Sequence, residues 1–87
     1  ERMRPTVTIN GYYRHFKGSI YRVIAIAKDC DNLSLKVVYQ NTKNDEVWIR
    51  DYEEFLSEVD HQKYPNIKQK YRFEEIEPSF LNNKKGD

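Results

Sequence analysis

Residues 19–28, which read SIYRVIAIAK, decide the fold of this chain. Side chains alternate between the two faces of a β-strand. In a regular strand one face would carry Ile20, Ile24 and Ile26, and the other Tyr21, Val23, Ala25 and Ala27. Because both faces are apolar, we expect a central strand, which could bend between two layers.

Further short strands are expected on both sides of this stretch. Asn10-Gly11 and Lys17-Gly18 are turn signals, since glycine tolerates a positive φ. We expect strands at residues 12–16, 33–40, 46–50 and 71–76, with weaker candidates at 6–9 and 55–59. Residues 51–54 are expected to form one helical turn capped by Asp51. Many short strands predict an all-β barrel or sandwich, and a barrel is favoured because it leaves no strand edge exposed.

Alternation also predicts which strand faces meet the core. In residues 33–40 the core face would carry Leu33, Leu35, Val37 and Tyr39. In residues 46–50, Trp48 and Arg50 lie opposite Val47 and Ile49, and we expect the first pair on the free face. Tyr39 is expected in the core, with a hydroxyl that could reach the rim.

Length and composition restrict the class of protein. The 87 residues suffice for one domain, expected at 11–77 between a lead (1–10) and a polar tail (78–87), and the chain could be a piece of a longer protein. Cys30 is the sole cysteine, which fits a cytoplasmic setting. The longest apolar run is too short to span a membrane. A formal net charge of +1 argues against nucleic acid as the main partner.

Three motifs carry a resemblance to a known family. In order they are YRHFKG (13–18), VVYQ (37–40) and WIR (48–50), with Phe55 following. Together they resemble a bacterial and phage domain family of unknown function, over roughly residues 11–76. The resemblance implies an SH3-like β-barrel of five to six strands. Members of that family occur alone or joined to nucleotide-hydrolysing domains, which implies a nucleotide-related ligand.

The candidate ligand-binding residues combine aromatic rings and cations. Trp48 could stack on a planar ligand while Arg50 pairs with its anionic group; alternatively, Trp48 plugs the barrel end and Arg50 forms a structural salt bridge. The resemblance adds His15 and Lys17 to the candidates. Without it, both residues would be interpreted as part of an exposed, solvated strand edge. The full candidate set is Tyr13, His15, Lys17, Tyr39, Trp48 and Arg50.

A second set of cations lies near the carboxyl end. Lys63, Lys68, Lys70 and Arg72 are interleaved with tyrosines, a pattern that binds single-stranded nucleic acid. Glu74, Glu75 and Glu77 follow closely and could balance that charge. Catalysis finds little support, because Asp29 and Asp31 flank Cys30 and disfavour its thiolate. No metal and no cofactor is expected.

These observations predict a non-enzymatic binding module for a small anionic planar ligand. A nucleotide or a nucleotide-derived signal fits best, which the protein could sequester. Two alternatives stay open: a protein–protein interaction domain that docks a peptide or a partner enzyme, and a weak nucleic-acid-binding domain that uses residues 63–72. A homo-oligomer also stays open.

Overall fold

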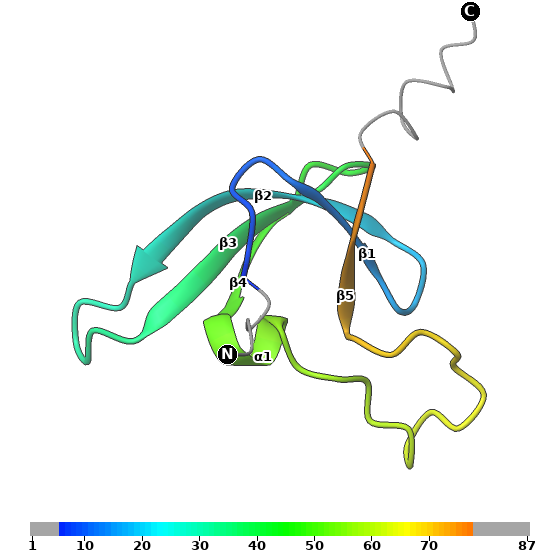
Figure 1. The fold of residues 1–87 in the computed structure, drawn as a ribbon. Coiled ribbons are helices and arrows are strands. Elements are labelled where there is room, and N and C mark those ends of the chain that lie inside the picture. Colours follow the sequence, from blue (N-terminus) through cyan, green and yellow to red (C-terminus); the bar gives the residue numbers. More distant parts are fainter. Residues whose placement is uncertain (1–5, 78–87) are drawn as a thin grey trace, which may run out of the picture.

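The computed structural model describes residues 6–77, which form one five-stranded antiparallel sheet and one short helix (Figure 1). The elements are β1 (Tyr12–His15), β2 (Ile20–Lys28), β3 (Leu35–Asn41), β4 (Val47–Asp51), α1 (Tyr52–Phe55) and β5 (Phe73–Ile76). The predicted small all-β fold is confirmed. Residues 1–5 of the predicted lead and the predicted tail at 78–87 lie outside the described residues.

The strands lie in the order β4-β3-β2-β1-β5, so β2 is central, as predicted. The sheet bends strongly over α1 but does not close: β4 and β5 remain its two edges (Figure 1). The sequence favoured a barrel because a closed sheet leaves no strand edge exposed, but this sheet stays open. Instead, the segment from α1 to β5 crosses the open side, where Glu58 and Tyr71 form an isolated bridge.

A β-bulge in β2 explains how both of its faces can be apolar. Val23 pairs with Tyr39 of β3, but Ala25 pairs with the very next residue of β3, Val38, so Ile24 is an extra residue. Past the bulge Ile26 lies on the same face as Val23, and both contact the core. The expectation of regular alternation along residues 19–28 is therefore wrong beyond Val23.

The pairing between β3 and β4 decides which side chains of β4 lie on the core face of the sheet. Val37 and Tyr39 are buried as predicted, whereas Leu33, in a turn, and Leu35, at the strand end, are exposed. Val37 pairs with Arg50, and Tyr39 pairs with Trp48. Directly paired residues share a face. The expectation that Trp48 and Arg50 occupy the free face is thus wrong, since the outer face of β4 carries the exposed Val47 and Ile49.

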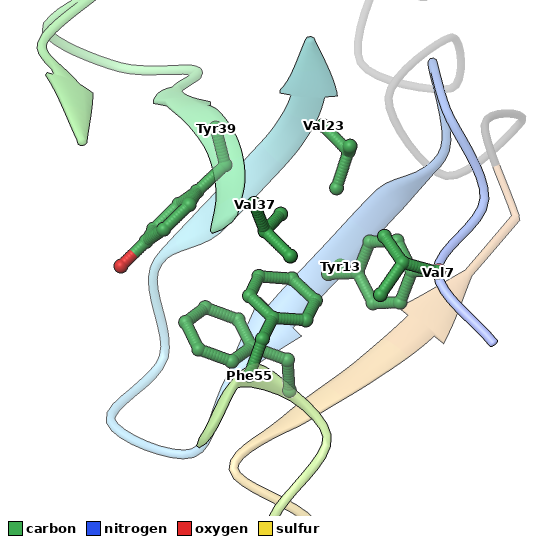
Figure 2. Packing of buried hydrophobic residues seen from close by; sticks show 7 residues of the cluster. Val7, Tyr13, Val23, Val37, Tyr39 and Phe55 are labelled. Atoms are coloured by element: carbon green, nitrogen blue, oxygen red, sulfur yellow. The ribbon is translucent and has the colours of Figure 1, made fainter. Parts of the chain in front are cut away.

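Stacked and edge-on aromatic rings fill the core (Figure 2). Phe55 of α1 is fully buried and stacks on Phe73 of β5, with ring centroids 4.1 Å apart. Tyr13 and Tyr39 approach Phe55 edge-on at 5.3 and 5.4 Å. Because a chain of this size has few core positions, large rings supply most of the buried apolar area.

Turns and flanking segments complete the fold. Gly18 has a φ of 112°, and its N–H donates to the carbonyl of His15, which confirms the tight turn. Residues 6–9 form no strand, although Val7 is buried against the core. Residues 55–59 contribute the end of α1 and one bridge rather than a strand. Asp51 precedes α1 without a side-chain cap; its carboxylate pairs with Lys36 instead.

Candidate anion-binding cleft

A polar cleft of about 280 Å³ lies where the β1–β2 turn, β4 and the 60–64 turn meet. Its lining residues are His15, Phe16, Lys17, Arg50, Asp60, Lys63, Tyr64 and Arg72. Four of these carry a permanent positive charge and one, Asp60, is acidic. The Asp60 carboxylate already accepts hydrogen bonds from the backbone N–H groups of residues 62 and 63. The cleft therefore offers a net positive charge to a ligand.

Two arginines face this cleft from opposite edges of the sheet. Arg50 of β4 donates from Nε to the Tyr39 hydroxyl (3.3 Å), and its Nη1 lies 3.6 Å from the exposed Glu54 carboxylate. Arg72, just before β5, donates from Nε to Ser57 Oγ (3.3 Å). Each Nε bond fixes a guanidinium plane. In the described part of the chain, the terminal nitrogens of Arg72 have no ion-pair partner, whereas Arg50 shares Nη1 with Glu54 and would bind a phosphate or carboxylate through Nη2 or by releasing that exposed carboxylate.

His15 lines the same cleft as these arginines and is a neutral ring. Its Nδ1 accepts a hydrogen bond from the backbone N–H of Lys17 (3.0 Å), so the proton of the neutral ring resides on Nε2. Burial, together with the positive charges of Arg50, Arg72 and Lys17, lowers the pKa of His15 from 6.5 to about 4. His15 therefore contributes a hydrogen-bond donor without a charge at neutral pH.

Two aromatic rings form a wall of the cleft. The rings of Phe16 and Tyr64 lie 5.0 Å apart, and His15 stacks on Phe16 at 4.5 Å. The ammonium groups of Lys17 and Lys63 lie 5.3 and 5.5 Å from the centre of the Tyr64 ring. Cations over aromatic faces are favourable. The wall thus combines planar surfaces with flexible positive charge.

Backbone contacts tie the 60–72 segment to the sheet. The side-chain amide of Gln69 donates to the carbonyls of Arg14 and Tyr71, at 3.0 and 2.9 Å. The N–H of Phe16 donates to the carbonyl of Arg72. The bonds from Gln69 to Arg14 and from Phe16 to Arg72 join residues that are more than fifty positions apart in the sequence. The cleft is therefore part of the folded domain.

The structure brings some predicted ligand-binding residues together and separates others. His15, Lys17 and Arg50 line the cleft, but Trp48 does not, and half of its surface is exposed. Tyr13 is buried, and its hydroxyl accepts a hydrogen bond from the N–H of Thr8. Tyr39 is buried too, but Figure 2 shows its hydroxyl oxygen pointing away from the other labelled side chains, and Arg50 binds that oxygen.

The second cation set is also divided. Lys63 and Arg72 line the cleft, whereas Lys68 and Lys70 lie outside it, with Lys70 over the ring of Tyr71. Phe16, Tyr64 and Asp60 are cleft residues that sequence reasoning did not select. Alternation would place Phe16 opposite His15, but β1 ends at His15 and the turn rotates the next residue toward the cleft.

Three side chains that could hold a metal ion also lie close together after β2, outside the cleft. The ligand atoms of Asp29, Cys30 and Asp31 lie within 4.8 Å of one another. Cys30 and Asp31 are exposed, and the Asp29 carboxylate accepts a hydrogen bond from the backbone N–H of Asp31, as in an ordinary Asx turn. Among residues 6–77, no helix is long and apolar enough to cross a membrane.

Comparison with protein families identifies the domain. Residues 11–75 match the model of a protein family of unknown function, DUF1653. The chain belongs to the DUF1653 family. No curated protein and no solved structure matched the chain.

The region that matches the DUF1653 family contains the whole cleft. The DUF1653 match begins just before β1 and ends within β5, and every residue that lines the cleft falls inside it. The cleft is thus built entirely from the DUF1653 domain.

Proposed function

We propose that this domain binds a small anionic ligand with a planar group, such as a nucleotide or a nucleotide-derived signal, and does not transform it. The observation that carries the proposal is the pair Arg50 and Arg72, which come from different elements, line one cleft and are each held by a side-chain hydrogen bond. Phosphate and carboxylate are the groups that paired guanidinium forks recognise best.

Electrostatics support an anion over a neutral or cationic ligand. Lys17 and Lys63 add mobile positive charge at the aromatic wall, and Asp60 already accepts two backbone hydrogen bonds. His15 would donate from Nε2 to an anionic oxygen. Within residues 6–77, no carboxylate forms an ion pair with Lys17, Lys63 or Arg72, so these cations need not break one to bind a ligand.

The aromatic wall and the size of the cleft narrow the ligand further. A base could stack on the Tyr64 ring if it displaces the lysine side chains that lie over it, and such stacking contributes about 1–3 kcal/mol per base in nucleic-acid-binding proteins. A volume of about 280 Å³ is at the lower end for small-molecule sites. A mononucleotide fits this size better than a longer ligand does.

Isothermal titration calorimetry with a panel of mononucleotides, their uncharged nucleosides and inorganic phosphate tests the proposal. We expect phosphorylated members to bind, nucleosides not to bind, and inorganic phosphate to bind more weakly because it lacks the base. Arg50→Gln or Arg72→Gln should weaken binding roughly 10- to 100-fold, the range for hydrogen bonds to charged groups. Arg14→Gln, an equal charge change at an exposed position of β1, is the matched control.

Two results would refute this function. One is the absence of measurable binding to every member of the panel. The other is binding that Arg50→Gln and Arg72→Gln leave unchanged relative to Arg14→Gln. Substituting Lys68 and Lys70, which lie outside the cleft, separates the nucleic-acid alternative: that alternative predicts steeply salt-dependent RNA or DNA binding that is lost in this variant. A cleft ligand should bind the same variant normally.

A further inference from the structure

The edge strand β4 has an unusual concentration of exposed apolar side chains. Val47, Trp48 and Ile49 are consecutive and are 54, 50 and 64% exposed. Only β3 pairs with β4 among the described strands, so its second edge is free. Exposed apolar edge strands are templates for pairing with another strand, and natural proteins usually blunt them with charge, proline or a covering segment.

The backbone pairing fixes which groups of β4 face outward. The N–H of Asn41 donates to the carbonyl of Glu46, so these two residues form a hydrogen-bonded pair. Such pairs alternate with non-bonded pairs along an antiparallel ladder. Backbone groups of residues 46, 48 and 50 therefore point to β3, while those of Val47, Ile49 and Asp51 point to the free edge.

One two-fold register of β4 against a second β4 matches these groups and their side chains. It sets Trp48 opposite Trp48 of the second copy, on the axis. Val47 then lies opposite Ile49 of the second copy and exchanges backbone hydrogen bonds with it. Glu46 lies opposite Arg50 of the second copy, which pairs opposite charges. Centring the axis on Arg50 would instead oppose two guanidinium groups, and centring it on Ile49 would set Val47 against Asp51.

We propose that the β4 edge is an interaction surface for a second copy of this chain, which joins the two sheets in this antiparallel register. The self-complementary pattern is the reason to choose a second copy, because a two-fold interface requires every residue pair to occur twice. Aromatic and β-branched cross-strand pairs are the ones that stabilise antiparallel strands. Val47, Trp48 and Ile49 lie outside the cleft, whereas Arg50 belongs to both the cleft and this edge.

Sedimentation equilibrium over a wide concentration range, without added anion, tests the surface. We expect a monomer–dimer equilibrium. Ile49→Lys should raise the dissociation constant of the dimer by about tenfold or more, because the two-fold axis places the changed residue in the interface twice. Leu33→Lys, the same exchange at an exposed turn residue, should leave the equilibrium unchanged. Trp48 is the single tryptophan, so its fluorescence should shift to longer wavelength on dilution as the dimer dissociates.

Complementary charge variants test the register itself. Glu46→Arg and Arg50→Glu each place like charges in both copies of the pair, so each variant alone should be more monomeric than the wild type. An equimolar mixture restores both ion pairs and should form heterodimers. A monomer at all concentrations, a dimer insensitive to Ile49→Lys, or a mixture no more dimeric than its components would overturn the proposal. The calorimetric test of the cleft with Arg72→Gln would stand independently, because Arg72 is not part of β4.

Discussion

His15 provides the sharpest test of how the cleft is built. The ring accepts a backbone hydrogen bond at Nδ1, packs on Phe16 and faces Arg50 and Arg72. Acidification would place a positive charge on this ring among existing positive charges. We therefore predict that His15 stays neutral until the pH falls to about 4.

The pKa also sets a pH dependence of stability. A fall of the His15 pKa from 6.5 to about 4 corresponds to roughly 3 kcal/mol at full effect. Because the ring is only partly buried, solvent screening reduces the expected contribution to about 1–2 kcal/mol. Between these pH values the unfolded chain binds a proton that the folded chain does not. The stability that the neutral His15 contributes to the folded state is therefore fully present above pH 6.5 and is lost as the pH falls through about 4.

Nuclear magnetic resonance titration of the histidine ring signals measures this pKa directly, with His15→Gln used for assignment. The nitrogen shifts should also show the proton of the neutral ring on Nε2. In parallel, urea unfolding should show that the wild type loses about 1–2 kcal/mol more stability than His15→Gln as the pH drops from neutral to about 4. A His15 that titrates at or above its ordinary pKa of 6.5 would refute the described arrangement of the cleft.

Four further substitutions probe the scaffold. Gly18→Ala should cost about 1–2 kcal/mol of unfolding free energy, because φ is 112° there although no atom would clash with the added methyl group. Phe55→Ala should cost about 3–5 kcal/mol in urea unfolding, and Ile49→Ala, at a mostly exposed site, under about 0.5 kcal/mol. Tyr39→Phe keeps the ring but removes the oxygen that holds Arg50 Nε, so ligand affinity in calorimetry should fall several-fold while stability falls by only about 1 kcal/mol. Equal costs for Phe55→Ala and Ile49→Ala, or unchanged affinity in Tyr39→Phe, would contradict the packing and the positioning role described above.

Much of the fold follows from local patterns. The apolar run 19–28 indicated a central strand, Gly18 a tight turn, and Val37 and Tyr39 a core face, and the structure agrees on all of them. These features depend on a residue and its near neighbours. The bulge at Ile24 was not predictable in this way, because it is a property of the register between β2 and β3.

The face of β4 shows the same limit. Apolar Val47 and Ile49 suggested the core side, yet Arg50 and Trp48 lie on it, because the outer face of an edge strand can remain apolar without being covered. For the cleft, the chemistry of His15, Lys17 and Arg50 was apparent from the sequence. That Lys63, Tyr64 and Arg72 join them depends on bonds such as those of Gln69 to residues 14 and 71, which no local pattern encodes.

The extra residue in β2 also restricts how this sequence can change in length. Ile24 shifts the alternation of side chains in β2 by one residue. Val23 and Ile26 therefore both face the core although they are an odd number of positions apart. Deleting one residue between them would remove the bulge and leave Val23 and Ile26 two positions apart, still on the same face, whereas inserting one more residue would turn the second half of the strand away from the core unless the bulge widened. We therefore expect this stretch to accept the loss of the bulged residue more readily than the gain of another, because only the gain changes which side chains face the core.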